Sequence, residues 1–211
     1  TGAGGSIGSE LCREILLNSP KLLVLLELNE FSLYHVERKF RNLSSIPIVP
    51  CLGSVLDSEL IKHLLHDHQI NTVYHAAAYK HVPLVEENPL QGLRNNVLGT
   101  QSLLEKCLEA DVNSFVLIST DKAVRPTNIM GTSKRIAEMS DSCDSFDGLD
   151  SHDSCDSFDK CHAICESCDS LDSLDSLDFL DSLNFLDSLY FLVSPYFLDS
   201  LDFLDSRDFP D

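Results

Sequence analysis

The chain has 211 residues, enough for one domain of ordinary size, and its formal net charge is −19. The charge is unevenly divided: residues 1–140 hold 15 acidic and 13 basic residues, whereas residues 141–211 hold 19 acidic and 2 basic ones. The first part is nearly neutral and has no basic stripe, which argues against nucleic acid as a partner. We also expect no membrane span, because no run of eighteen apolar residues is present, and no signal peptide.

The cysteines follow the same division. Cys12, Cys51 and Cys107 are scattered among apolar residues, and we expect them to be buried free thiols. The other five lie beyond residue 140, at Cys143, Cys155, Cys161, Cys165 and Cys168. Buried thiols are typical of a reducing compartment, so the sequence predicts a cytoplasmic protein.

Residues 1–140 alternate between two hydrophobic patterns. Short runs rich in Val, Ile and Leu predict strands buried on both faces, at Leu22–Glu27, Ile46–Leu52, Thr72–Ala76 and Ser114–Ser119. Apolar residues at helical spacing predict helices between them, at Ser6–Asn18, Phe31–Asn42, Ser58–Asp67, Leu93–Ala110 and Met130–Met139. This alternation predicts an α/β fold, a doubly wound parallel sheet with helices on both sides.

The opening stretch, TGAGGSIGSE, places glycines three residues apart immediately before a predicted helix. Glycines allow a tight turn and let the backbone approach a pyrophosphate, which the positive end of the helix then attracts. Glu27 follows Gly8 by nineteen residues and ends the next predicted strand, where a carboxylate binds ribose hydroxyls. We therefore predict a dinucleotide-binding Rossmann domain with cofactor contacts at Gly2, Gly5, Ser6, Ile7, Gly8 and Glu27.

This fingerprint normally follows the central strand of the sheet. Here the sequence starts one residue before the first glycine. We therefore expect a fragment whose sheet lacks its first strand.

Three further motifs carry a family resemblance: AAAYKHVP (76–83), STDKAVRPTN (119–128) and MGTSKR (130–135). With the glycine fingerprint they make residues 1–140 resemble the extended short-chain dehydrogenases. More narrowly, they resemble the CapD-like polysaccharide biosynthesis proteins, the inverting UDP-N-acetylglucosamine 4,6-dehydratases. The resemblance implies NADP or NAD as cofactor, a nucleotide sugar of the UDP-N-acetylglucosamine class as substrate, a role in surface polysaccharide biosynthesis and a homo-oligomer.

The resemblance also implies the chemistry. Hydride leaves sugar carbon 4, water is eliminated across carbons 5 and 6, and hydride returns to carbon 6. The keto group at carbon 4 makes the carbon 5 proton acidic, so oxidation comes first and a base and an acid are then needed.

The implied catalytic residues are Lys122 as the carbon 5 base and Asp121 as the acid for the leaving hydroxyl. Lys134 would hold the nicotinamide ribose and favour the alkoxide, and Thr120 would bind the sugar. Met130 stands where the superfamily usually has tyrosine, and we expect it to pack or to admit a water.

Other cofactor contacts are implied by position. The Gly53–Asp57 stretch follows a strand where the superfamily contacts adenine, and small residues close the next strand. The additional expected contacts are Asp57, Ala76, Ala77, Ala78, Lys80, Asn96 and Ser119.

Two choices stay open. Glu27 favours NAD, yet relatives also use the phosphorylated cofactor. His63, His66 and His68 have the look of a metal cluster, but on a polar, helix-ending stretch we expect them to be solvated and expect no metal.

From Asp141 the sequence becomes an Asp-Ser/Phe-Leu/Phe repeat with a period of three. Neither a helix nor a strand has this period, and dense like charge opposes compaction. We therefore expect two parts, a nucleotide-binding fragment at 1–140 and a disordered low-complexity tail at 141–211, with a frameshift or repeat expansion as one origin. The tail does not resemble the family's sugar-binding part, so we expect a dehydratase fragment that is inactive alone. The alternatives are a non-catalytic truncated remnant and a nucleotide-sugar epimerase of the same superfamily.

Overall fold

The computed structural model describes residues 1–140 and 160–165 of the chain. Within them, β1 (Leu23–Glu27) pairs in parallel with β2 (Ile48–Leu52), and β3 (Thr72–His75) pairs in parallel with β4 (Ser114–Ser119). A fifth strand, β5 (Lys160–Cys165), lies parallel to the other side of β4. The helical elements are α1 (Ser6–Leu17), α2 (Glu30–Leu43), α3 (Ser58–His68), α4 (Val82–Glu87), α5 (Pro89–Leu93), the π-helical turn η1 (Arg94–Leu98), α6 (Gly99–Glu109), the 3-10 turn η2 (Asp121–Ala123) and α7 (Ile129–Ser140).

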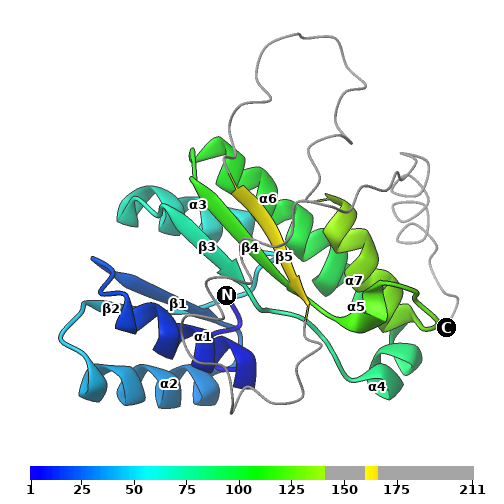
Figure 1. Cartoon of the computed structure of the whole chain (residues 1–211), viewed down its shortest axis with the longest axis horizontal. Helices are drawn as coiled ribbons and strands as arrows, with labels where there is room; N and C mark the ends of the chain where they lie inside the picture. Colours follow the sequence, from blue (N-terminus) through cyan, green and yellow to red (C-terminus); the bar gives the residue numbers. More distant parts are fainter. Residues whose placement is uncertain (141–159, 166–211) are drawn as a thin grey trace, which may run out of the picture.

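Helices cover both faces of the strands (Figure 1). Neighbouring residues of a strand point to opposite faces, and the core divides accordingly. Leu25 of β1 packs with α1 and α2, whereas the next residue, Leu26, packs with α3 and α6. In β4, Val116 faces α1 while Leu117 faces the opposite cluster. β1 and β4 therefore pack against helices on both faces, as their continuous apolar runs require.

Among the described residues, only residues 1–3 form hydrogen bonds that link the two sheets. The Thr1 amino group donates to Tyr74 O (2.8 Å), and Ala76 N donates to Thr1 O (3.2 Å). On the other side, Ala3 N donates to Leu26 O (3.3 Å). Figure 1 shows the N-terminus between the two pairs of strands. This is where the central strand of the predicted sheet would end.

A cavity of about 750 Å³ extends from Thr1 along this gap. Its walls include the edges of β1 and β3 and apolar side chains of α1, α3 and α6, among them Leu11, Ile15, Ile61, Leu65 and Leu103. The described structure therefore matches a doubly wound fold without its first strand.

The strand–helix alternation is confirmed, and four predicted strands fall within two residues of the observed ones. β3 ends at His75 instead of Ala76, because Ala76 N bonds to Thr1. The short helix α4 was not predicted, since its six residues are too few to show helical periodicity and Pro83 interrupts the pattern. The predicted helix Leu93–Ala110 is the later part of a longer helical run that begins with α5 and contains η1.

The expectation for the cysteines is confirmed at two positions and wrong at one. Cys12 and Cys107 are buried, and burial raises the pKa of Cys12 to about 11 and that of Cys107 to about 12. Cys51 is only partly buried, because it lies on β2 at the edge of its sheet.

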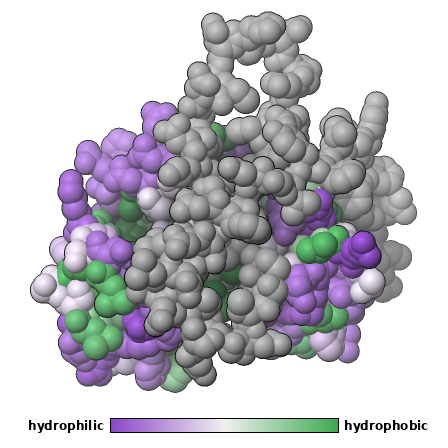
Figure 2. Space-filling model, viewed as in Figure 1, coloured by the Kyte–Doolittle hydropathy of each residue, from purple (hydrophilic) through white to green (hydrophobic). Residues whose placement is uncertain are grey.

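Outside residues 160–165, the expected disordered tail lies beyond the part of the chain that the structure describes. No described helix has the length and apolar character needed to cross a membrane. The visible described surface in Figure 2 mixes hydrophilic and hydrophobic residues.

Candidate functional site

The glycine loop is closely packed, and its glycines are required by geometry at two positions. Gly2 has a φ of +66°, and a Cβ there would lie 2.7 Å from Ala77 N. A Cβ at Gly8 would lie 2.0 Å from Gly2 O, which no side chain tolerates. Gly5 N donates to Gly2 O (3.1 Å) and closes the turn. The loop therefore presents backbone atoms without side chains at the start of α1.

The N-terminus of α1 carries no negative side chain. Its N-cap residue is Gly5, no side chain caps the first turn, and that turn contains no acidic residue. The first amides of a helix have no partner inside the helix, and the helix dipole makes this end positive. Residues Ser6 and Ile7 of this turn line a cavity, so the end is suited to an anionic group.

Glu27 is held beside the loop by two backbone amides. Gly4 N donates to Oε2 (2.8 Å), and Asn29 N donates to Oε1 (3.0 Å). The expected closeness of Glu27 and the glycine loop is thereby confirmed. Each carboxylate oxygen has further acceptor capacity, so the group can still accept hydrogen bonds from ribose hydroxyls.

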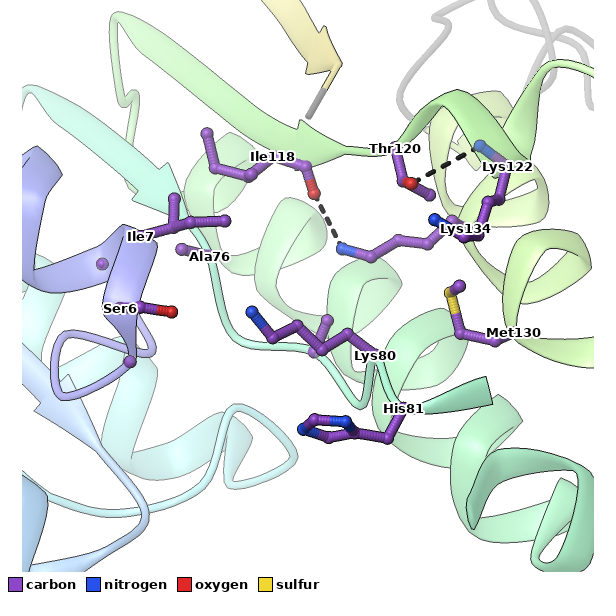
Figure 3. Close-up of a pocket in the computed structure, with 13 residues that line it drawn as sticks. Ser6, Ile7, Ala76, Lys80, His81, Ile118, Thr120, Lys122, Met130 and Lys134 are labelled. Carbon is purple, nitrogen blue, oxygen red and sulfur yellow. Dashed lines mark hydrogen bonds between the residues drawn. The ribbon is translucent and has the colours of Figure 1, made fainter. Parts of the chain in front are cut away.

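One cavity of about 280 Å³ joins the glycine loop to the stretch that follows β4. Figure 3 shows the side chains of Lys80 and Lys134 extending into the space between Ser6 and Ile7 on one side and Met130 on the other. The residues that line it are Gly5, Ser6, Ile7, Gly8, Ala76, Ala78, Lys80, His81, Ile118, Thr120, Lys122, Met130 and Lys134. It therefore has cationic side chains and no carboxylate among its described lining residues.

The turn after β4 presents three polar side chains. Thr120 Oγ1 donates to Asp121 Oδ1 (3.0 Å), and Lys122 Nζ lies 3.5 Å from the same oxygen. The Asp121 and Lys122 side chains are 61% and 52% exposed. The Thr120 hydrogen bond, followed by the Lys122 charge, lowers the pKa of the Asp121 carboxyl. Asp121 is therefore ionised in this arrangement.

Helix α7 supports this turn at a point where only glycine fits. A Cβ at Gly131 would lie 2.5 Å from Lys122 O. One helical turn further on, Lys134 is 7% exposed, and its Nζ donates to Ile118 O (2.7 Å). Met130, at the start of α7, is 3% exposed and contributes to the cavity wall. The lysine is thus fixed in the cavity by a backbone carbonyl.

Asn96 lies outside this cavity lining, and its amide forms an internal clamp. Tyr79 N donates to Asn96 Oδ1 (2.8 Å), and Asn96 Nδ2 donates to Tyr79 O (3.0 Å) and to Ser133 Oγ (3.0 Å). Asn96 is 1% exposed. It fixes the loop after β3 to α7, the helix that carries Lys134. Its motif gave no indication of this bridge, because Tyr79 and Ser133 are distant in the sequence.

Six other residues named from the sequence are also absent from the cavity lining: Gly2, Glu27, Asp57, Ala77, Ser119 and Asp121. Ser119 Oγ donates to a carboxylate oxygen of Glu138 in a short hydrogen bond. Asp57 caps α3 by accepting from Leu60 N (3.0 Å). Ala77 N donates to Thr1 Oγ1 (3.4 Å).

Sequence reasoning did not name His81 as a site residue, although it follows Lys80 at the carboxyl end of a parallel strand. For metals, the described residues contain no group of three or more His, Cys, Asp or Glu side chains arranged to hold an ion. The roles assigned to all these residues remain predictions.

Residues 1–145 match the sequence profile of a family described as polysaccharide biosynthesis protein. The capsular polysaccharide biosynthesis protein CapD of Staphylococcus aureus is 46% identical over 141 residues, which cover 66% of this chain and 24% of CapD. An inverting UDP-N-acetylglucosamine 4,6-dehydratase of Campylobacter jejuni is 32% identical over 139 residues, 64% of this chain and 39% of the enzyme. The chain thus spans between a quarter and two fifths of these relatives.

Solved structures share the fold. Pen from Bacillus thuringiensis superposes with a TM-score of 0.61 at 28% identity, covering 65% of this chain and 42% of Pen. A dTDP-glucose 4,6-dehydratase from Streptomyces venezuelae, DesIV, with NAD bound, superposes with a TM-score of 0.57 at 22% identity, covering 66% of this chain and 48% of that protein.

Proposed function

Because this chain belongs to the polysaccharide biosynthesis protein family, within the nucleotide-sugar dehydratase and epimerase superfamily, we propose that residues 1–140 are the cofactor-binding part of a nucleotide-sugar 4,6-dehydratase of the UDP-N-acetylglucosamine type. The observation that carries the proposal is the single cavity that joins the glycine loop to Thr120, Lys122 and Lys134. A dinucleotide lying from the loop toward these residues would place its reactive ring beside the catalytic side chains.

The described residues fit NAD. The glycine loop leaves no room for side chains, the positive end of α1 favours the pyrophosphate, and Glu27 is positioned for a ribose. When bound, this cofactor accepts and returns the hydride. Lys134, held by Ile118 O, would orient the nicotinamide ribose and stabilise the sugar alkoxide through its charge.

We further propose that NAD is preferred over NADP. A 2′-phosphate would meet the Glu27 carboxylate, which Gly4 and Asn29 hold in place. Repulsion between the phosphate and the carboxylate would weaken the binding of NADP. The residues that follow, Leu28 to Leu33, include no lysine or arginine to neutralise the phosphate.

The reaction would proceed at the Thr120–Lys122 turn. Thr120 binds the sugar, Lys122 takes the carbon 5 proton as a neutral amine, and Asp121 protonates the leaving hydroxyl. The proton that the Lys122 ammonium carries in the free pair must therefore first pass to Asp121. The free structure holds Asp121 ionised, whereas a general acid needs its proton. A substrate that covers the turn would remove water from the exposed carboxylate and raise the pKa of Asp121. Proton transfer therefore depends on closure of the site around the sugar.

We propose that this chain alone binds the cofactor but does not complete the reaction, because Asp121 and Lys122 are more than half exposed. An epimerase is disfavoured by Met130, since that reaction needs a titratable group where the superfamily has tyrosine.

The test incubates the purified chain with NAD and UDP-N-acetylglucosamine. Calorimetry should show NAD binding, while NMR shows no keto-deoxy sugar. If the folded chain binds no NAD, the chain is a non-catalytic remnant and the proposed function is wrong. Repeated turnover to the keto-deoxy sugar would confirm a dehydratase but refute inactivity. A carbon 4 epimer would instead identify an epimerase.

A further inference from the structure

A buried histidine connects the glycine loop to the helical run behind it. His75 ends β3 and is 1% exposed. Its Nδ1 lies 2.6 Å from Thr1 Oγ1, and its Nε2 lies 2.9 Å from Thr100 Oγ1 on α6. The imidazole therefore bridges the first residue of the glycine loop and a helix that does not line the 280 Å³ cavity.

The hydrogen bonds define which ring nitrogen carries the proton. Thr100 Oγ1 donates its only proton to Asn96 O (2.7 Å), so it can only accept from His75. Nε2 must then be the donor. In a neutral ring, Nδ1 is consequently the acceptor, and the Thr1 hydroxyl donates to it.

This direction matters for the loop. Because the Thr1 hydroxyl proton points at His75, its oxygen lone pairs face Ala77 N, 3.4 Å away. Thr1 is also bonded through its backbone to Tyr74 and Ala76 on either side of His75. The next residue, Gly2, approaches Ala77 so closely that no Cβ fits. The orientation of Thr1 thus determines how the loop lies on the end of β3.

We propose that His75, as its Nε2–H tautomer, is a positioning residue that holds Thr1 and the glycine loop in the form that binds the dinucleotide. The inference rests on the proposed cofactor binding. It assigns a role to a residue that does not line the cavity, and it links the loop to Asn96, which clamps Tyr79 and Ser133 on the opposite side of the site.

The charges around His75 support the neutral form. Burial is the main cause that lowers its pKa, and the positive charge of Lys134 lowers it further. Thr100 and Asn96 add no charge on this side of His75, since they contribute an uncharged hydroxyl and an uncharged backbone carbonyl. Because unfolded histidine takes up a proton below about pH 6.5, the stability of the fold should fall as the pH drops below that value.

The test compares two substitutions that each keep one half of the bridge. The side-chain oxygen of His75→Asn reaches the position of Nδ1 and can accept from Thr1. The amide of His75→Gln reaches the position of Nε2 and preserves only the contact with Thr100. We expect His75→Asn to bind NAD within about threefold of the unmodified chain and His75→Gln to bind about tenfold more weakly, the loss of one buried hydrogen bond.

A role in core packing alone predicts the reverse order, since glutamine is closer to histidine in size. Equal NAD affinity in both variants and the unmodified chain would also overturn the inference. If the unmodified chain binds no NAD, the proposed function itself fails. If it binds NAD but the two variants do not differ as expected, only the inference about His75 fails.

Nitrogen NMR of the unmodified chain keeps the proposal testable if the variants do not fold. The expected spectrum has a protonated Nε2 and an unprotonated Nδ1 at pH 7. A protonated Nδ1 would contradict the assignment. Thr1→Val should weaken NAD binding as much as His75→Gln, and the double variant should show no added loss if both act through one hydrogen bond.

Discussion

The glycine loop, with Glu27 bonded to it, and the Thr120–Lys122 turn meet at one cavity that the loop and the turn line, but the two regions are held very differently. Both oxygens of Glu27 accept backbone hydrogen bonds, and the loop packs so closely that two of its glycines cannot be replaced. The Asp121 and Lys122 side chains are more than half exposed and 3.5 Å apart. The difference indicates that the proposed cofactor site is built by the backbone of residues 1–140, whereas the proposed catalytic turn depends on what covers it.

The largest expected effect is at Gly8. In Gly8→Ala the new Cβ would lie 2.0 Å from Gly2 O, so the loop must move. Such overpacking costs about 1–3 kcal/mol, which corresponds to about 5–150-fold in NAD affinity. Gly5→Ala is the comparison variant, because its Cβ would lie 3.3 Å from the same oxygen and would test direct contact with NAD with little movement of the loop. Calorimetry measures both, and equal losses would show that the loop is not rigid.

The next effect concerns the anchoring of the loop between the sheets. An added segment of five apolar, β-branched residues before Thr1 should occupy the 750 Å³ cavity and pair with β1 and β3. Each net hydrogen bond contributes about 0.5–1.5 kcal/mol. We therefore expect the free energy of unfolding to rise by about 2 kcal/mol and Tm to rise by about 4–8 °C.

A Gly-Ser segment of the same length is the control for that experiment. Its flexibility and lack of apolar surface should leave Tm unchanged. An equal rise in both extended chains would mean that the cavity does not accept a strand.

A smaller effect is expected at Glu27. Glu27→Gln keeps the shape of the side chain but removes its charge, so NAD should bind about tenfold more weakly, because hydrogen bonds to charged groups contribute about 1.5–3 kcal/mol. The affinity for NADP should fall less or rise. Titrations with both cofactors test this, and an unchanged preference would exclude Glu27 as the group that selects NAD.

The smallest effect should come from the catalytic turn. Lys122→Ala removes an exposed side chain and Asp121→Asn removes only the charge of another. The Kd for NAD should therefore stay within about threefold of the unmodified chain, since surface substitutions change the free energy by about 0.5 kcal/mol. Lys134→Ala is the contrast, since it removes a buried lysine bonded to Ile118 O. If Lys122→Ala weakens NAD as much as Lys134→Ala does, the two regions are not separate.

The sequence predicted most of the fold because its signals are local. Apolar runs marked β1 to β4, and the spacing of the glycines and Glu27 predicted that they lie close together, which the hydrogen bond from Gly4 N to Glu27 confirms. Asn96, Ser119 and Asp57 show where such reasoning ends. Each was named from its motif, but its hydrogen-bond partner depends on tertiary packing or on a local cap. The role of His75 was invisible for the same reason, since its partners are Thr1 and Thr100.

The most direct test of the central claim is a calorimetric titration of NAD and NADP into the purified 211-residue chain. We predict saturable one-to-one binding of NAD, with NADP binding at least about tenfold more weakly because its 2′-phosphate meets Glu27. Circular dichroism would establish that the chain is folded in the same buffer. A folded chain that binds neither cofactor, or that binds NADP more tightly than NAD, would contradict the account.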